Sequence, residues 1–413
     1  MPRSQPAPAA PEDHLRKLVA TVLAALAVAA ARPARADGLG ANADSVYLVG
    51  VFVDPVCVYQ HGMTGVDQKA CAMVPGRVDQ GMAFLDLRRR RLFTVIGMTH
   101  TQNPRQAFLD LLGDTVAVSA RLWKAQGSYA IAVNGVWPVD HQPRPAWSWW
   151  PVRWHLSTLE GCALLAALYL LAAGPLRRKL GGPERFEIGR ATAFLLSLVV
   201  VVGSLNGPLH DLSDLYLFST HMVQHLLLAQ LFPPLFIFGL SPWLMAWLLR
   251  NAGVRGAWRF LAGVPMGFIL YSIVFSIWHL PPLYNLMMRA HGFHVAMHLM
   301  VMGTAVLMWW PILGNAPGMP RMNPPLQMLY LLLLSTPMTA VGAAITFAAR
   351  PLYEWYALAP RVFDMTALDD QKLGALIMWI PGTLFYWLIL SAIFLRWATR
   401  EAKTGDAVLP KPA

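Results

Sequence analysis

The chain has 413 residues, of which 56% are hydrophobic and 13% are charged, and its formal net charge is +11 at pH 7. A soluble protein of this length would carry more charge, so the composition indicates a protein with several membrane spans. Basic loops on one side of a membrane explain the positive charge without a nucleic-acid partner, and three cysteines exclude a disulfide-dense scaffold.

The N-terminus has the features of an export signal. Two basic residues precede an apolar run over residues 18–31, and Ala-Arg-Ala at 34–36 fits a signal-peptidase site. We therefore predict a signal peptide over residues 1–36, with an uncleaved N-terminal anchor as the alternative. In both cases the following segment is expected outside the cytoplasm, in the periplasm, where thiols can oxidise.

Residues 37–145 have the pattern of a separate β-rich domain. Four stretches rich in Val, Tyr and Phe are broken by Gly and Pro, namely "SVYLVGVFVD", "RLFTVIGM", "DTVAVSARLW" and "SYAIAVNGVW". Several short strands in so few residues predict a small barrel or sandwich, and the pattern is similar to an OB-type barrel. The basic run "LRRRRL" is interpreted as a hairpin or strand edge facing solvent, and "DHQPRPAW" as a linker into the membrane.

Seven later stretches are apolar and long enough to cross a bilayer. They are residues 155–173, 190–206, 215–239, 258–280, 292–313, 326–348 and 372–396. The sequence "SPWLMAWLLR" after the third stretch is interpreted as an interfacial helix. The predicted fold is therefore mainly α: a membrane helical bundle of about seven spans over 146–400, preceded by the β-rich exported domain and followed by a cytoplasmic tail over 401–413.

The loop charges predict the orientation of the bundle. If the β-rich domain is outside, thirteen Lys and Arg residues lie in or beside the inner loops and the C-terminal segment, and four lie in the outer loops. This bias follows the positive-inside rule and agrees with the signal peptide. We expect a multi-pass protein of the bacterial inner membrane with a periplasmic N-terminal domain.

The histidines gather at the predicted outer ends of three spans. These are His221 and His225 in span 3, His279 at the end of span 4, and His294 and His298 in span 5. Polar groups at membrane depth are costly and face a bundle interior or cavity, and two His four residues apart in a helix present their nitrogens on one face. Because imidazole suits copper, zinc and iron, we expect a metal site here.

Other polar residues near this end receive weaker assignments. Asp369 and Asp370 precede span 7 on the same side, as candidate ligands or as groups that orient the imidazoles. His155 and His291 are expected among lipid headgroups, His210 is undecided, and Asp214 is interpreted as a helix cap. Hydrogen bonding between helices is the alternative to a metal site for all these polar groups.

A second cluster lies in the exported domain, in "VCVYQHGMTGVDQKACAM". Cys57 and Cys71, with nearby His and Met side chains, offer the soft donors that Cu(I) prefers. The alternatives are a Cys57–Cys71 disulfide in an oxidising compartment, which is slightly favoured, and a reversible dithiol switch.

Five motifs of the membrane region together resemble the caa3-type cytochrome c oxidase assembly factor (CtaG) family. They are "LYLFSTHMVQHLLLAQLFPPLFIFGLSP", "SIWHLPPLYN", "FHVAMHLMVMGTAVLMWWPI", "AAITFAARPLYEWY" and "LDDQKLGALIMWIPG". The resemblance implies a polytopic protein needed to make an active haem–copper oxidase, at a copper-insertion step. It also implies that the five clustered histidines and the segment Asp369-Asp370-Gln371 are functional positions.

These observations predict a non-enzymatic assembly factor. Copper, received as an ion or from a copper chaperone, is expected to bind the histidine cluster and pass to cytochrome c oxidase subunits in the lipid bilayer. A haem-binding membrane redox protein is the alternative, since two axial imidazoles suffice for haem. A copper transporter is a further alternative, but the inner halves of the spans offer few polar residues.

Overall fold

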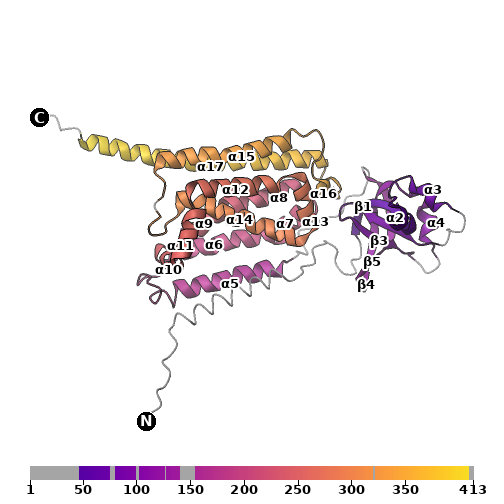
Figure 1. Cartoon of the computed structure of the whole chain (residues 1–413), viewed down its shortest axis with the longest axis horizontal. Helices are drawn as coiled ribbons and strands as arrows, with labels where there is room; N and C mark the ends of the chain where they lie inside the picture. The colour runs from indigo at the N-terminus through magenta and orange to yellow at the C-terminus, as the bar shows by residue number, and fades with distance from the viewer. Residues whose placement is uncertain are drawn as a thin grey trace, which may run out of the picture.

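The computed structural model describes residues 46–74, 80–98, 102–125, 127–139, 154–319 and 321–408. The predicted signal peptide and the Pro-rich linker lie outside these ranges. Within them, a small β-barrel precedes a larger helical bundle and lies beside one end of it, which we call the barrel end (Figure 1).

The N-terminal domain is a closed barrel of five strands in the order β1-β2-β3-β5-β4. The strands are β1 (Val46–Val53), β2 (Met82–Asp86), β3 (Arg91–Val95), β4 (Thr115–Ala125) and β5 (Ser128–Pro138). All pairs are antiparallel except β3–β5. A five-stranded barrel is the architecture of OB folds, so the predicted small β-rich barrel is confirmed. The sequence patterns located every strand except β2.

Among the described residues of this domain, three short helices and one helical turn accompany the strands. They are α2 (Pro55–His61), α3 (Gln68–Ala72), α4 (Pro104–Phe108) and the 3-10 turn η1 (Leu109–Leu111). The aromatic rings of Phe52, Phe84 and Phe93 are fully buried in the barrel core. Their burial provides much of the apolar contact that a domain of this size needs for stability.

The bundle contains long membrane-type helices and short connecting ones. The long ones are α5 (Leu156–Ala173), α6 (Ile188–Leu205), α12 (Val264–Trp278), α14 (His291–Leu313), α15 (Pro324–Thr346) and α17 (Ala367–Val408). The shorter ones are α7 (Gly207–Leu215), α8 (Phe218–Leu226), α9 (Phe232–Gly239), α10 (Pro242–Leu248), α11 (Ala252–Leu261), α13 (Pro281–Arg289) and α16 (Glu354–Ala357).

Six helical segments of the described chain are long and apolar enough to cross a membrane, and they match six of the predicted spans. The remaining predicted span, 258–280, corresponds to α11 and α12, which are bent by 64° at a short break. The two helices count as a seventh crossing only if the bent pair is one span. Gly263 and Pro265 at the break explain the bend, because proline removes a backbone donor and glycine resists helix formation.

The third span contains a π-helical turn, Leu227–Leu231, between α8 and α9. Pro233 begins the next turn and has no N–H group for the carbonyl of Ala229. That carbonyl accepts a hydrogen bond from Trp309 Nε1 on α14 at 3.0 Å. The irregular turn therefore keeps its backbone satisfied inside the bundle, as buried polar groups require.

The last span packs closely against α8 at Gly374. A Cβ atom at this position would lie 2.4 Å from Cδ1 of Phe218 and 2.9 Å from the Cα of Ser219. Only glycine therefore allows α17 to come this close to the start of α8. One turn earlier on α17, the carboxylate of Asp370 reaches the same helix end.

Candidate metal centre

Five histidines meet inside the barrel end of the bundle, and none exposes more than 7% of its surface. The ring centroids of His221 and His294 are 5.7 Å apart, and those of His225 and His298 are 6.0 Å apart. The ring of His279 lies 5.6 Å from that of His225. The structure thus brings together all five histidines named as ligands from the sequence, while their role as ligands stays a prediction.

The two histidine pairs point their nitrogens at each other. The Nε2 atoms of His221 and His225 are 2.9 Å apart, and those of His294 and His298 are 3.0 Å apart. Two nitrogens that bind one ion at about 2.0–2.1 Å lie about 3 Å apart, so each pair has a spacing suited to chelation. The four-residue spacing on α8 and α14 produces this geometry directly.

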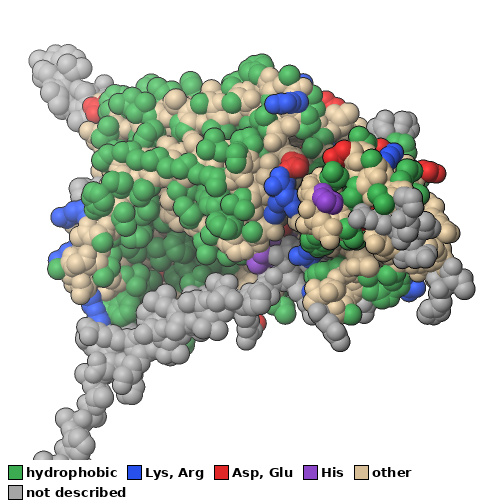
Figure 2. All heavy atoms as spheres, turned by 45° about the vertical axis from the view of Figure 1, so that its right-hand side comes forward, with side chains coloured by type: hydrophobic (Ala, Val, Ile, Leu, Met, Phe, Trp, Pro, Cys, Tyr) green, Lys and Arg blue, Asp and Glu red, His purple; other side chains and the backbone are tan. Residues whose placement is uncertain are grey.

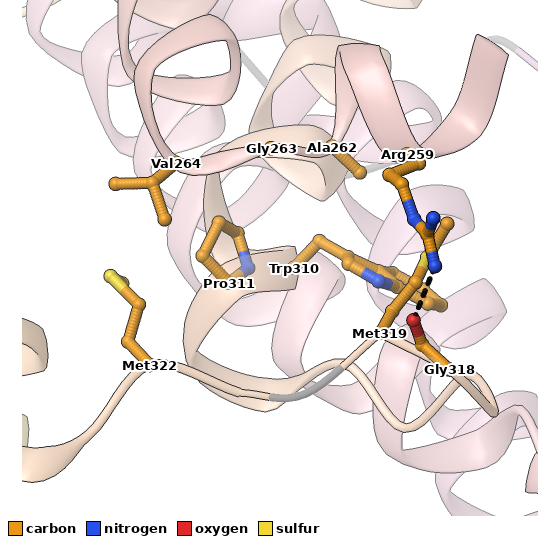
Figure 3. Close-up of a pocket in the computed structure, with 9 residues that line it drawn as sticks. All are labelled: Arg259, Ala262, Gly263, Val264, Trp310, Pro311, Gly318, Met319 and Met322. Atoms are coloured by element: carbon orange, nitrogen blue, oxygen red, sulfur yellow. Dashed lines mark hydrogen bonds between the residues drawn. The ribbon is translucent and has the colours of Figure 1, made fainter. Parts of the chain in front are cut away.

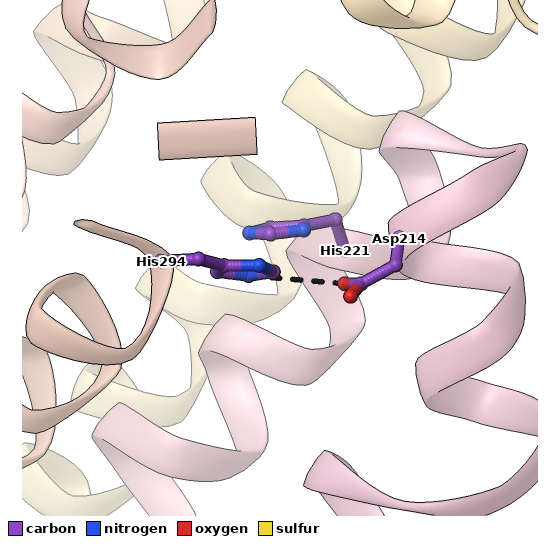
Figure 4. Close-up of side chains that lie close together, drawn as sticks. All are labelled: Asp214, His221 and His294. Carbon is purple, nitrogen blue, oxygen red and sulfur yellow. Dashed lines mark ion pairs between the residues drawn. The ribbon is translucent and has the colours of Figure 1, made fainter. Parts of the chain in front are cut away.

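Asp214 completes a compact donor set with His221 and His294. One ligand atom from each of the three residues lies within 4.8 Å of the other two. Figure 4 shows the carboxylate of Asp214 facing the two imidazoles, with its Oδ1 atom 3.7 Å from His294 Nε2. Asp214 lies near the C-terminal end of α7, so it does not cap a helix as the sequence suggested. Its place beside the imidazoles is what sequence reasoning missed.

A tyrosine fixes the tautomer of His221. The hydroxyl of Tyr356 donates its only proton to the carbonyl of Ser213 at 2.6 Å. It can therefore only accept from Nδ1–H of His221, which lies 3.2 Å away. With its proton on Nδ1, His221 keeps a lone pair on Nε2, the atom that faces the cluster.

His279 is held in the same way. Its Nδ1 lies 2.6 Å from the carbonyl of Phe275 and donates to it. Its Nε2 is buried and has no hydrogen-bond partner among the described atoms. A buried nitrogen lone pair without a donor is costly unless another group or an ion binds it.

A hydrogen-bonded chain positions Asp214. The side-chain amide of Gln224 donates to the carbonyl of Ser204, and its Nε2 lies 3.0 Å from Nδ1 of His210. The Nε2 atom of His210 lies 3.3 Å from Oδ2 of Asp214. His210 was undecided from the sequence. Its Nε2 orients the carboxylate, and its ring also lies 4.4 Å from that of His155 and 6.2 Å from that of His294. His210 and Asp214 are four residues apart, which is the spacing of one helical turn. This segment had been assigned to a loop from the sequence, so the spacing was not used.

The pKa shifts of His210 and Asp214 favour a neutral imidazole beside a charged carboxylate. Burial lowers the pKa of His210 to about 4, although Asp214 opposes the shift. Burial alone would raise the pKa of Asp214, but the neighbouring rings of His210 and His294 outweigh it and lower the pKa. A deprotonated carboxylate and a neutral imidazole are the forms that a cation requires.

Asp369 and Asp370 do not reach the histidine cluster. The carboxylate of Asp370 accepts hydrogen bonds from the backbone N–H groups of Phe218 and Ser219 at 2.8 and 3.1 Å. Asp369 is exposed and accepts from the hydroxyl of Thr366 at 2.6 Å. Both carboxylates therefore serve helix ends, since α8 and α17 begin there, and we leave them out of the ligand set.

The barrel domain covers the barrel end of the bundle through the turn between β2 and β3. Arg88 is 4% exposed, donates to the carbonyls of Asp214 and Leu215, and lies 4.1 Å from the centroid of the Trp355 ring. Arg289 donates to the carbonyl of Arg88 at 3.0 Å. The basic run was expected to face solvent. That expectation is wrong for Arg88, because the carbonyls and the indole of the bundle replace water around the guanidinium.

Cys57 and Cys71 form a disulfide between α2 and α3 of the barrel. This is the pairing slightly favoured from the sequence. Disulfide sulfurs are not thiolates, so a copper-binding role for these two residues applies only to a reduced form of the domain.

A cavity of about 250 Å³ lies at the opposite end of the bundle, at the bend between α11 and α12 (Figure 3). Its lining includes Arg259, which donates to the carbonyl of Gly318 at 2.7 Å, and several apolar side chains. No His, Cys, Asp or Glu lines it in the part of the chain that the structure describes. It therefore lacks metal donors of that kind, and the candidate centre is the histidine cluster.

A sequence model of the cytochrome c oxidase caa3 assembly factor family matches residues 167–400 of the chain. The chain belongs to this family. The match covers the helices that carry His221, His279 and His294, so the candidate centre is part of the family region. The five-stranded barrel and α5 up to residue 166 lie before it.

Three curated relatives of this chain are mycobacterial. A protein of Mycobacterium leprae described as uncharacterized is 25% identical over 272 residues, and uncharacterized proteins of Mycobacterium bovis and Mycobacterium tuberculosis are each 26% identical over 277 residues. Each alignment covers 61% of this chain and 40% of the relative, so the chain spans less than half the length of the relatives it matches. No solved structure matches.

Proposed function

We propose that this chain binds copper as cargo at the barrel end of its membrane bundle and passes it to a subunit of a haem–copper oxidase during assembly. Family membership supports the assembly role. The metal role is supported by one observation above all: the donor atoms of Asp214, His221 and His294 lie within 4.8 Å of one another.

The chemistry of the donors suits a borderline cation. Two imidazole nitrogens and one carboxylate oxygen are ligands for copper or zinc, and the adjoining His225 and His298 offer further nitrogens. Tyr356 and Gln224 act behind the ligands, the first on His221 directly and the second on Asp214 through His210. Such outer partners fix ligand orientation in metal sites.

The charge distribution supports a periplasmic position for the centre. Arg250 follows α10, and Arg255 and Arg259 lie on α11; both helices lie at the end of the bundle opposite the barrel (Figure 1). The positive-inside rule places that end in the cytoplasm of a bacterial cell, so the barrel and the histidines face the periplasm. Delivery to a partner needs no covalent step, and the protein acts as a metallochaperone rather than an enzyme.

Metal analysis of protein purified in detergent tests this proposal. We expect about one copper ion or more per chain after loading with Cu(II) or Cu(I) and desalting, and a loss of that copper in His221→Ala and His294→Ala. The matched control is Glu184→Ala, which removes an exposed carboxylate from the loop at the opposite end of the bundle. Equal copper in the control and in both cluster variants would refute the ligand assignment.

The same samples separate the haem alternative. A Soret band in the visible spectrum of the untreated protein, lost in the His221 and His294 variants, would replace the copper proposal with haem binding. Zinc retained in preference to copper under competition would keep the site and change its cargo.

A further inference from the structure

The cavity at the bend between α11 and α12 lies at the basic end of the bundle. It has a volume of about 250 Å³ and is lined by this bend, the end of α14 and the loop that follows α14. Figure 2 shows Lys and Arg side chains at the end of the bundle away from the barrel, beside a broad apolar surface. In a membrane bundle, such a border between apolar and basic surface lies at the level of the lipid headgroups. The lining shares no residue with the histidine cluster.

One side of the cavity carries two hydrogen-bond donors from different helices. Figure 3 shows Arg259 of α11 and Trp310 of α14 on this side. The guanidinium of Arg259 donates one N–H to the carbonyl of Gly318 at 2.7 Å. A guanidinium has five N–H groups in a planar fork, so this bond leaves others for an anion in the cavity.

The indole N–H of Trp310 is a buried donor without an acceptor. The side chain lines the cavity and is 3% exposed, and its Nε1 has no hydrogen-bond partner among the described residues. The ring of Trp258 packs edge-on against it, with the centroids 4.9 Å apart, and holds the indole in place. An unsatisfied buried donor is costly, so an acceptor oxygen of a ligand would remove that cost.

The N-terminus of α12 adds a third feature that favours an anion. Gly263 and Val264 line the cavity, and the N-cap residue Gly263 provides no side chain to accept from the first N–H groups of α12. The partial positive charge of a helix N-terminus attracts an anion. No Asp or Glu lines the cavity in the described part of the chain, so an ammonium group would find no partner there.

The opposite side of the cavity is apolar and indicates a lipid rather than a free anion. Figure 3 shows Val264 and Met322 on this side. Every residue of α11 is at least partly exposed, and Phe260, next to Arg259, is 62% exposed. A helix with arginines and exposed apolar residues, bent by 64° from the following span, has the features of one that lies in the membrane interface.

We propose that this cavity binds the phosphate group of an anionic diacyl phospholipid such as phosphatidylglycerol. The phosphate oxygens accept hydrogen bonds from Arg259 and Trp310, and the glycerol backbone lies against Val264 and Met322. The cavity holds the phosphate and the glycerol, and the acyl chains remain outside it in the lipid phase. The site goes beyond copper delivery and uses none of the proposed metal ligands.

Calorimetric titration of the full chain in a non-ionic detergent tests the proposal. The probes are dihexanoyl phosphatidylglycerol, dihexanoyl phosphatidylcholine and inorganic phosphate. We expect saturable binding of the phosphatidylglycerol, and binding weaker by about tenfold or more for the other two probes. Arg259→Gln removes the charge at the cavity and should weaken phosphatidylglycerol binding by a similar factor. Arg255→Gln is the matched control, because it removes the same charge from an exposed position of α11 that does not line the cavity.

Trp310→Phe removes the indole N–H and keeps an aromatic ring beside Trp258. It should also weaken phosphatidylglycerol binding, while Arg259→Gln, at an exposed residue, guards against a folding defect in this buried variant.

Four outcomes would overturn the proposal. They are a lack of saturable phosphatidylglycerol binding, equal affinity for phosphatidylcholine, equal losses in Arg259→Gln and Arg255→Gln, and binding of inorganic phosphate as tight as that of the lipid. The second would show an acyl-chain site, the third a general surface charge, and the fourth a site for free phosphate. Copper loading is measured on the same preparations and should not change in Arg259→Gln, so failure of one proposal is distinguished from failure of the other.

Discussion

The Oδ1 atom of Asp370 lies 2.6 Å from the hydroxyl of Ser219, 151 positions earlier in the chain. The same carboxylate accepts from the first backbone N–H groups of α8, where an N-cap residue would normally act. The N-cap position of α8 is Leu217, which has no side-chain acceptor. A residue of the last span therefore caps the helix that carries His221 and His225.

Replacing Asp370 with alanine should destabilise the bundle without removing metal. The change leaves three buried donors at the start of α8 without their acceptor, at a cost of about 1–3 kcal/mol in the free energy of unfolding. Asp369→Ala, at an exposed position, should cost less than about 0.5 kcal/mol. Thermal unfolding in detergent and copper content check both variants. A loss of copper in a folded Asp370→Ala protein would return this carboxylate to the ligand set.

Removing the hydroxyl of Tyr356 should weaken metal binding more than it weakens the fold. Tyr356→Phe takes the acceptor from His221 Nδ1–H and frees the ring to change tautomer. Loss of such an outer partner typically lowers metal affinity about 10–100-fold. Tyr330→Phe is the control, because its hydroxyl donates to the carbonyl of Met308, away from the cluster. Copper affinity is measured by competition with a chelator. Equal affinities in the two variants would contradict the tautomer argument.

Substituting Arg88 with alanine should loosen the contact between barrel and bundle. Hydrogen bonds from a charged group contribute about 1.5–3 kcal/mol, and Arg88 makes two with the carbonyls of Asp214 and Leu215. We expect faster amide hydrogen exchange in the β2–β3 turn and around Trp355, with unchanged exchange in β4. Arg121→Ala, an exposed arginine on β4, is the control. Unchanged exchange at Trp355 would mean that Arg88 does not hold the two parts together.

The pH dependence of stability should include a term from Glu187 at the opposite end of the bundle. Partial burial opposes its ionisation, but hydrogen bonds from Ser241 and Trp243, at 2.5 and 2.8 Å, lower its pKa below the ordinary value of 4.5. A carboxyl whose pKa is lower in the folded protein stabilises the fold above its unfolded pKa. This stabilisation is lost as the pH falls through the folded value.

Melting temperatures between about pH 6 and 3 measure this term. The wild type should lose more thermal stability on acidification than Glu187→Gln, in which the side chain no longer titrates. Glu184→Gln, at an exposed residue of the preceding loop, should follow the wild type. Parallel curves for the wild type and Glu187→Gln would exclude the contribution.

The sequence predicted those parts of the centre that depend on helical spacing within one segment. His221 and His225, like His294 and His298, are four residues apart, so the period of the helix alone placed each pair on one face. The loop charges then placed both pairs at one end. The strand patterns predicted the barrel. They did not predict β2, because this strand is short and lies before a run of arginines.

Contacts between distant segments could not be predicted in this way. Asp214 lies near His294 only because the folded bundle brings the end of α7 to the start of α14. A loop assignment for residues 207–215 also concealed that His210 and Asp214 are one helical turn apart. Tyr356 lies 135 positions from His221. The role of Arg88 depends on how the barrel and the helical bundle meet, and no periodic pattern in the sequence predicts that contact.

Because Gly374 has no side chain, the segment "LDDQKLG" acts in helix packing, whereas its two carboxylates had suggested metal ligands. Gly374 follows Asp370 by one helical turn, so the missing methyl group and the carboxylate act on the same partner, Phe218 and its neighbour. The segment therefore holds the beginning of the last span against the start of α8, which belongs to the third span. A methyl group introduced at position 374 would push α17 away from α8. It would thereby change the orientation of the imidazoles of His221 and His225 without contacting either.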